Sequence, residues 1–391
     1  MSAPSTDGHS NRQPLRIFYA ASVGAIAGFP FLAPILVDAG LQKAHTALLF
    51  LVFPICKLVV APLIAVLVDR TGQARHVLSL CALGAMLSAL LIATSDHVGL
   101  LCAGVCLLAI ANTPIFPLGD AMTVRVLGAK ASDYGSIRAW GSGTLVLLVL
   151  LVGWLSETAG RALLLPTIVG FAATAIASQR LPKAPPDQAA RERPSPLLLL
   201  REPTTLLLVA IAVVHGATFT TYDKLFTMHV DLRGHPGWVA GAGIALGIAT
   251  ETIILWRARY FLERWGAPYT LFAGIAIGTL RWWITAHTTS AFWLATVQCL
   301  HGGSFGLFWI AGIQLFNARA PDELKSTTQA LFQGATLGAG QLTGMLLSAL
   351  LIPIGDTPLV FTALVFADVL AALLCLPLIL RARSGQFSAS E

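Results

Sequence analysis

Long apolar stretches and short polar connections alternate along almost the entire chain. Each stretch holds about twenty residues, the length of helix that crosses a hydrocarbon layer of ~30 Å. Barrel strands would instead show short segments of alternating polarity, and an open sheet would leave backbone groups unpaired in lipid. The pattern therefore predicts twelve transmembrane helices, near residues 15–38, 46–68, 76–95, 99–123, 134–156, 161–179, 203–229, 236–262, 267–287, 290–317, 325–353 and 357–380.

The composition supports an all-α membrane protein. Of the 391 residues, 56% are hydrophobic and 11% are charged, whereas soluble domains average about 25% charged residues. The net charge is +6, but the basic residues do not form a cluster on a soluble domain. We therefore expect no nucleic-acid partner. The six cysteines fall in apolar spans without ligand spacing, and we expect no disulfide, metal site or cofactor.

One polar connection is much longer than the others. It runs from Arg180 to Glu202, carries five prolines and mixed charges, and is typical of an extended linker. The chain is therefore predicted to consist of a six-helix N-terminal half (1–180), a cytoplasmic linker (181–202) and a six-helix C-terminal half (203–391).

The Lys and Arg residues between the spans predict the orientation, because cytoplasmic loops of membrane proteins carry an excess of them. With the N-terminus inside, the outer loops hold only Lys43, Arg161 and Arg233, and all other loop Lys and Arg residues are inside. We expect a multi-pass, monomeric protein of the cytoplasmic (inner) membrane, with both termini and the linker in the cytoplasm. Residues Met1 to Pro14 show no cleaved signal peptide.

Eight charged residues lie inside the apolar stretches rather than between them. A charge at the bilayer centre costs about 2.5–3.5 kcal/mol on insertion scales, so each should face a partner or a watery cavity. These residues are Lys57, Arg138, Lys224, Arg281, Asp120, Asp223, Glu251 and Asp368. Such a set indicates a solute pathway through a helical bundle.

Spacing assigns directions to some of these side chains. Gly243, Gly247 and Glu251 recur every fourth residue, so they share one helix face, and glycines on a face permit close helix approach. We therefore expect Glu251 to point into the bundle. Asp120 and Arg138 lie on consecutive helices, where opposite charges lower each other's desolvation cost. The partner of Lys57 cannot be read from the sequence, and Asp368 and Asp223 are two candidates.

A short motif occurs twice. Asp69-Arg70-Thr71-Gly72 returns 194 residues later as Glu263-Arg264-Trp265-Gly266, which indicates parallel six-helix repeats. The segment LVDRTGQAR (67–75) resembles the loop between spans two and three of the major facilitator superfamily, with departures at Ala65 and Gln73-Ala74. The resemblance implies that Asp69, Arg70 and Gly72 form a conformational switch, in which Asp69 binds across helix ends.

Three further segments narrow the resemblance. YGSIRAWGSG (134–143), TLRW (279–282) and HGGSFGLFWI (301–310) are similar to the branch that contains phenylpropionate permeases, lactose permease and nucleoside:proton symporters. The resemblance implies substrate-binding and proton-coupling roles for charged and aromatic residues of spans four, five and seven to ten. The predicted substrate-binding residues are Asp120, Arg138, Glu251, Arg281, His301, Trp309 and Tyr222, and the predicted proton-coupling residues are Glu251, His301 and Asp223.

Two departures from the sugar permease limit the prediction. Leu145 replaces the aromatic residue that follows the span-five arginine by seven positions, which argues against a galactoside. Ser304 replaces the proton-carrying glutamate that follows the histidine. Either Glu251 or Asp223 therefore carries the proton, or the protein is a facilitator.

We expect a secondary active transporter that imports a small organic solute together with protons by alternating access. An aromatic acid, a nucleoside and a sugar-like compound remain open as substrates, and a drug or metabolite efflux carrier of the same fold is the alternative. A membrane sensor would need a soluble signalling module. An enzyme is not expected, because the chain shows no nucleotide loop or nucleophile constellation.

Overall fold

The computed structural model describes residues 12–128, 133–182, 202–319 and 325–383, and most of the predicted linker (181–202) lies outside these ranges. The first half of the chain contains α2 (Arg12–Gly24), the 3-10 helix η1 (Ala25–Phe31), α3 (Leu32–Asp38), α4 (Lys43–Phe50), α5 (Val52–Thr71), α6 (Ala74–Thr94), α7 (Val98–Asn112), α8 (Ile115–Leu127), α9 (Tyr134–Leu155), the 3-10 helix η3 (Gly160–Leu164) and α10 (Leu165–Arg180). The described residues contain helices and connections but no β-strand.

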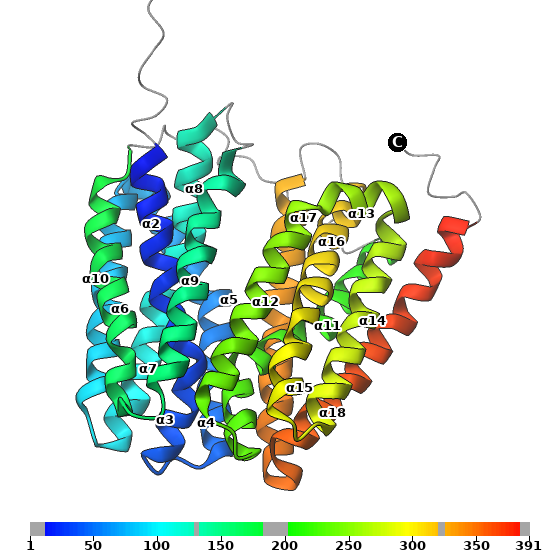
Figure 1. Ribbon diagram of the computed structural model, residues 1–391. Helices are drawn as coiled ribbons and strands as arrows, with labels where there is room; N and C mark the ends of the chain where they lie inside the picture. Colours follow the sequence, from blue (N-terminus) through cyan, green and yellow to red (C-terminus); the bar gives the residue numbers. More distant parts are fainter. Residues whose placement is uncertain (1–11, 129–132, 183–201, 320–324, 384–391) are drawn as a thin grey trace, which may run out of the picture.

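The second half has the same architecture with more irregular turns. It contains α11 (Pro203–Leu232), α12 (Gly237–Trp256), α13 (Ala258–Trp265), α14 (Ala267–His287), α15 (Ala291–Thr296), the 3-10 helix η6 (Val297–Cys299), the π-helix η7 (Gly302–Leu307), α16 (Phe308–Asn317), α17 (Lys325–Gln333), the π-helix η9 (Gly334–Gly340) and α18 (Gln341–Arg383). In Figure 1 the two halves stand side by side as two lobes of upright helices.

Ten segments of the described chain are long and apolar enough to cross a membrane. The last of them, Thr327–Arg383, has 57 residues and holds two helices, because the backbone is not helical at Gly355 and Asp356. Helix α14 has 21 residues but is less apolar than these segments. The twelve predicted helices are reached only if the 57-residue segment counts twice and α14 also crosses the membrane.

Apolar side chains lie on both sides of these helices. Large aromatic residues such as Phe18, Phe171 and Phe308 are fully buried between the helices. Other large apolar residues, such as Leu147 and Phe366, are about 70% exposed in the middle of a span. A water-soluble fold could not expose so many large apolar residues, so this outer surface faces lipid.

The two halves contact each other mainly at one end of the bundle. A Cβ atom on Gly153 of α9 would lie 2.9 Å from the Cα atom of Gly241 in α12, so only glycine permits this approach. Lys43 and Asp356 form an ion pair of 2.6 Å between α4 and α18. Thr227 of α11 donates a hydrogen bond to the Pro30 carbonyl. This end is the lower one in Figure 1, where α3 and α4 lie.

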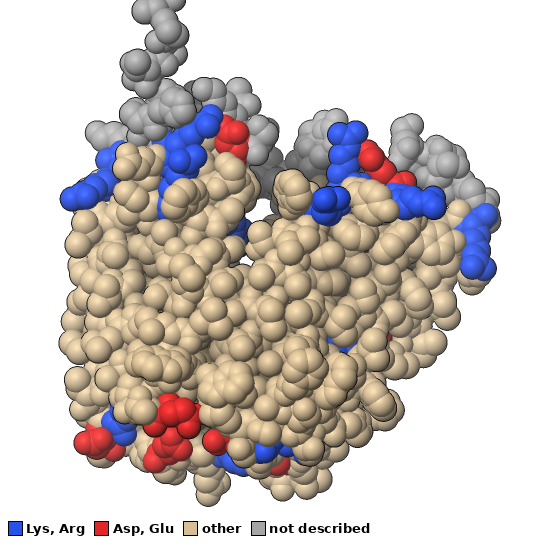
Figure 2. All heavy atoms as spheres, viewed as in Figure 1, with Lys and Arg blue, Asp and Glu red and all other residues tan. Residues whose placement is uncertain are grey.

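The opposite end is hollowed between the lobes. Figure 2 shows a notch in the surface at the upper edge, with Lys and Arg side chains gathered on both sides of it. The bundle is therefore closed at one end and open at the end where α2 begins and α18 finishes.

The internal repeat is visible in the backbone. Gly72 ends α5 and Gly266 ends α13, with φ angles of +67° and +75°. The amide of each donates to the carbonyl four residues earlier, Val68 or Leu262, at 2.8 and 2.9 Å. Glycine adopts a positive φ without the steric cost of a Cβ atom, which is why this residue recurs after 194 positions.

Candidate functional site

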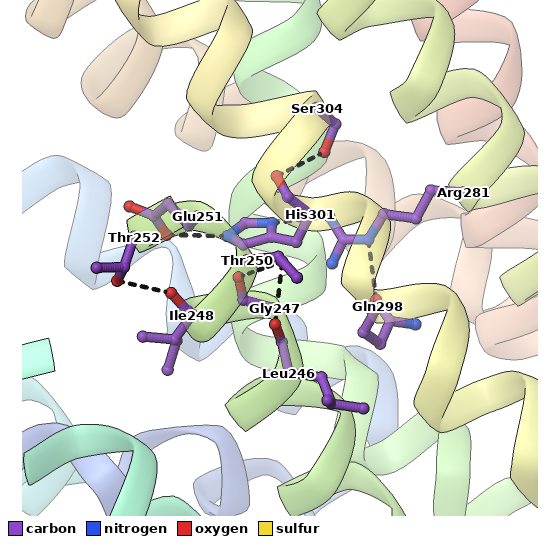
Figure 3. Close-up of polar contacts among 10 residues, drawn as sticks. All are labelled: Leu246, Gly247, Ile248, Thr250, Glu251, Thr252, Arg281, Gln298, His301 and Ser304. Atoms are coloured by element: carbon purple, nitrogen blue, oxygen red, sulfur yellow. Dashed lines mark hydrogen bonds and ion pairs between the residues drawn. The ribbon is translucent and has the colours of Figure 1, made fainter. Parts of the chain in front are cut away.

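The glycine face of α12 holds the C-terminal cluster together. A Cβ atom on Gly247 would lie 3.2 Å from the Cβ atom of His301, and one on Gly243 would lie 2.9 Å from Gln298. The two glycines therefore allow α12 to pack tightly on η6 and η7. Glu251, one turn further on, points toward His301, as the spacing predicted (Figure 3).

A chain of polar contacts crosses the C-terminal half. Arg281 of α14 donates from Nε to Gln298 Oε1 at 2.9 Å, and its Nη1 lies 2.9 Å from His301 Nδ1. On the other side of the imidazole ring, His301 Nε2 lies 3.4 Å from Glu251 Oε2. Gln298 in turn donates to Thr285. Four side chains from α12, α14, η6 and the start of η7 thus form one connected array (Figure 3).

This geometry determines the tautomer of His301. A guanidinium can only donate hydrogen bonds, so His301 Nδ1 must accept the bond from Arg281. The imidazole is then neutral, with its proton on Nε2 facing Glu251. Among these residues the carboxylate of Glu251 is left as the group that can gain a proton without breaking the contact between Arg281 and His301.

Arg281 is enclosed by aromatic rings. Its guanidinium carbon lies 4.0 Å from the ring centre of Tyr222 and 4.1 Å from that of Trp282, within the range of a cation–π contact with each ring. Arg281 is 0% exposed and Tyr222 is 4% exposed. In this conformation Arg281 and Tyr222 hold the array in place, and the accessible side chains are those of Glu251 and His301.

The N-terminal half holds a second polar cluster. Arg138 of α9 lies 3.6 Å from Asp120 of α8, as predicted, and donates to the Tyr134 hydroxyl at 2.9 Å. The Tyr19 hydroxyl donates to Asp120 at 2.6 Å. The side chain of Arg138 is 52% exposed and that of Asp120 is 31% exposed. This pair is therefore more accessible than the array of the C-terminal half.

A third group of charges joins the two halves. Lys57 of α5 donates to Gln341 of α18 at 2.7 Å. Lys224 of α11 lies over two rings of the other half, 4.2 Å from the ring centre of Phe53 and 5.0 Å from that of Phe29. Asp223 is exposed and interacts electrostatically with both lysines.

Asp368 is not the partner of Lys57. It lies 2.6 Å from His215 Nδ1, and both side chains are 0% exposed between α11 and α18. His215 also packs against the rings of Phe219 and Phe308. This ion pair is enclosed within the C-terminal half and cannot reach α5. Of the two carboxylates considered, Asp223 is the one near Lys57.

The predicted switch residues lie at the open end. Asp69 forms an ion pair of 3.8 Å with Arg125 of α8, so it does bind across helix ends, but within its own half. Arg70 is exposed, and Gly72 has the positive φ described above. No described contact links Asp69 to the C-terminal half.

Trp309 belongs to a stack of rings. His301 and Phe305 are 5.6 Å apart between ring centres at an interplanar angle of 19°, and Phe305 and Trp309 are 5.3 Å apart at 18°. The three rings recur every fourth residue along η7 and α16. The stack extends from the polar array along one side of the helix toward its cytoplasmic end in the predicted orientation.

Sequence reasoning missed three residues of these clusters. Gln298 bridges Arg281 and Thr285, and Tyr19 and Tyr134 bond Asp120 and Arg138. Each of these three residues carries a polar group within an otherwise apolar span, and this feature could have identified them from the sequence. Within the described residues, no group of three or more His, Cys, Asp or Glu side chains could hold a metal ion.

Comparisons with known proteins agree with this architecture. The model of the MFS_1 like family matches residues 14–363. The maltose permease of Geobacillus stearothermophilus is 28% identical over 368 residues, which cover 92% of this chain and 91% of that protein. The probable 3-phenylpropionic acid transporter of Escherichia coli (strain K12) is 27% identical over 232 residues, 58% of this chain and 60% of that protein.

Solved structures show the same fold. A mutant form of the nucleoside transporter NupG superposes with a TM-score of 0.82 at 16% sequence identity, covering 94% of this chain and 99% of that one. At this identity the likeness concerns the fold alone.

Proposed function

The chain belongs to the MFS_1 like family of the major facilitator superfamily, and from this premise we propose that it is a proton-coupled importer of a small, neutral polar solute. The array of Arg281, His301 and Glu251 carries the proposal. It places one partly accessible carboxylate beside a neutral imidazole whose other nitrogen is occupied by a buried arginine.

Glu251 is the proposed proton carrier. With a proton, its carboxyl group can donate a hydrogen bond to a solute; without one, it accepts the bond from His301 Nε2. Solute binding and proton binding are then linked at one side chain. Asp223 is the alternative carrier, because it is exposed and lies near Lys57, Lys224 and Arg281.

The conformation supports alternating access between two halves, residues 1–180 and 203–391. The contacts between Gly153 and Gly241 and between Lys43 and Asp356 close the end that we assign to the outside. The hollow end carries the Lys and Arg residues, and we assign it to the cytoplasm because such residues mark cytoplasmic surfaces (Figure 2). The protein is then in an inward-open state of the cytoplasmic membrane, with Asp69 paired to Arg125 within the N-terminal half.

The pairing of charges favours a neutral solute. Arg138 is paired with Asp120, and Arg281 is hydrogen-bonded to Gln298 and His301. A carboxylate solute would have to displace Asp120 from Arg138 or reach the fully buried Arg281, whereas hydroxyl groups can bond to the accessible side chains as they stand. The rings of Phe305 and Trp309 offer faces for a sugar or a nucleobase. The name of the maltose permease is in line with this class, whereas the probable 3-phenylpropionic acid transporter is named for an acid.

Ligand binding to purified protein tests the solute class. A ligand that binds only the folded state raises the apparent melting temperature by mass action. We expect stabilisation by a maltose-type sugar or a nucleoside and none by 3-phenylpropionate. The opposite ranking would reject the neutral class.

Transport into vesicles tests the coupling. In proteoliposomes with an acidic exterior, the stabilising ligand should accumulate, and its entry should alkalinise the exterior. Glu251→Gln, which cannot exchange a proton, should abolish accumulation and retain exchange of labelled for unlabelled ligand. Glu263→Gln is the matched control, because Glu263 is an exposed carboxylate paired with Arg259. Accumulation by Glu251→Gln with the pH dependence of the unmodified protein would remove Glu251 from the mechanism, and net movement only outward would indicate an efflux carrier.

A further inference from the structure

The outer surface of the N-terminal half carries a groove that the transport mechanism does not use. It lies between α2, α9 and α10 and has a volume of about 780 Å³, within the range of about 300–1,000 Å³ that is typical of pockets for small molecules. These three helices face the viewer in the left lobe of Figure 1. Ile17, Trp140 and Val169 on its walls are at least half exposed, so the groove opens to lipid.

The charges of the groove lie at one end. Arg12 and Arg16 occupy the first turns of α2, at the end of the bundle that we assign to the cytoplasm. Arg12 is neutralised by Asp133 at 2.5 Å. Arg16 lies 5.8 Å from the ring centre of Trp140 and has no ion pair within the part of the chain that the structure describes. One uncompensated guanidinium therefore faces the mouth of the groove.

The groove follows most of the span. Its lining on α2 begins at Arg12, and its lining on α10 reaches Pro166, in the first turn of that helix at the opposite end of the bundle. Below the arginines the lining is mainly apolar and includes small residues such as Ala20, Gly170 and Ala173. A positive charge at one end of a mainly apolar channel complements a lipid, which joins a charged headgroup to an apolar tail.

We propose that this groove binds one anionic phospholipid of the inner leaflet. The phosphate is held by Arg16, and the ring of Trp140 lies at the headgroup boundary, where tryptophan is enriched. One acyl chain fills the apolar part between α2 and α10. The bound lipid also covers the tight contact of Gly170 with Ala25 of η1, where a Cβ atom would lie 2.7 Å from the Ala25 Cα atom.

Lipid titration of the delipidated, full-length protein tests the proposal. Dioleoyl-phosphatidylglycerol should bind, by native mass spectrometry, in preference to dioleoyl-phosphatidylcholine, and it should raise the melting temperature. Arg16→Gln should weaken phosphatidylglycerol binding about five-fold, the effect of one basic residue near an anionic surface. Arg16→Lys, which keeps the charge, should recover most of the affinity even if Arg16→Gln is itself less stable.

The matched control is Arg257→Gln. Arg257 also lies over an exposed tryptophan, Trp256 at 5.0 Å, but outside the groove. The Arg257→Gln variant should bind phosphatidylglycerol as tightly as the unmodified protein does. Equal binding of the two lipids, an equal loss in Arg257→Gln, or the same stabilisation by inorganic phosphate alone would each overturn the proposal.

Discussion

The two halves place their charges in opposite environments. In the N-terminal half, Arg138 and Asp120 are partly exposed and are held by two tyrosine hydroxyls. In the C-terminal half, Arg281 is fully buried against two aromatic rings, and the pair of His215 and Asp368 is fully buried.

This difference in exposure suits the two groups of charges to two different roles. An accessible ion pair can form hydrogen bonds with a solute at little cost, because water already screens it. A buried pair that loses one member leaves an uncompensated charge. The N-terminal pair is therefore suited to contact with a solute, and the C-terminal groups are suited to keeping Glu251 and His301 in position.

The largest effect on stability is expected at the buried carboxylate. Asp368→Ala should lower the free energy of unfolding by about 3–5 kcal/mol, since it removes the buried carboxylate that lies 2.6 Å from His215 Nδ1. Asp120→Ala should cost about 1 kcal/mol, because the Tyr19 hydroxyl can turn to Thr123, 3.3 Å away. Thermal unfolding of both variants in the same detergent compares their losses of stability. Equal losses would contradict the contrast between the halves.

Exchange of arginine for lysine should show the same contrast on a smaller scale. Arg281→Lys loses the guanidinium's contacts with the rings of Tyr222 and Trp282 and one of two hydrogen bonds, for a cost of about 1.5–3 kcal/mol. Arg138→Lys keeps its charge near Asp120 at an exposed site and should cost less than about 1 kcal/mol. Melting temperatures, with ligand exchange as a second readout, compare the two. A larger loss of stability for Arg138→Lys would reverse the assignment of tasks.

A substitution at the contact between the halves should have an effect of intermediate size. Gly241→Val places a side chain against the Val149 carbonyl, 2.8 Å from the Cβ position, and overpacking of this kind costs about 1–3 kcal/mol. The variant should shift the protein toward states that are open at the outer end. A cysteine at Thr227, which contacts Pro30, should then react faster with an impermeant maleimide. Gly143→Val, where a Cβ atom meets nothing within 4 Å, should leave the labelling rate unchanged.

The smallest effect is expected at the exposed ion pair of this contact. Lys43 and Asp356 are each about 30% exposed, and such pairs contribute less than about 1 kcal/mol. Lys43→Gln should change the labelling rate of the Thr227 cysteine less than Gly241→Val does, and high salt should have a similar effect. A shift as large as that of Gly241→Val would mean that charge, not helix packing, closes this end.

The sequence predicted what depends on helix periodicity. The spacing of Gly243, Gly247 and Glu251 correctly placed the carboxylate inside the bundle, because residues four apart share a helix face. The repeated Gly72 and Gly266 were found through the same motif, and both have a positive φ, although their ψ angles of 10° and 157° differ. The contact of Asp120 with Arg138 followed from their positions on consecutive helices.

Contacts between distant helices could not be predicted in this way. Hydropathy gives the length of a span but not its rotation about its axis. The pairing of His215 with Asp368, 153 residues apart, and of Lys57 with Gln341, 284 apart, depends on that rotation. For this reason Asp368 was a plausible but wrong partner for Lys57.

The π-helical turn of η7 has a consequence for the ring stack. A π turn winds more than four residues into each revolution, so side chains four positions apart come close to lying above one another, and the rings of His301 and Phe305 are nearly parallel. Removing one residue between Gly302 and Gly306 would restore a coil of about 3.6 residues per turn and leave Phe305 three positions after the imidazole, roughly 60° around the helix axis from it. The two rings would then share a helix face without stacking, so the surplus residue of the π turn keeps the aromatic column in register.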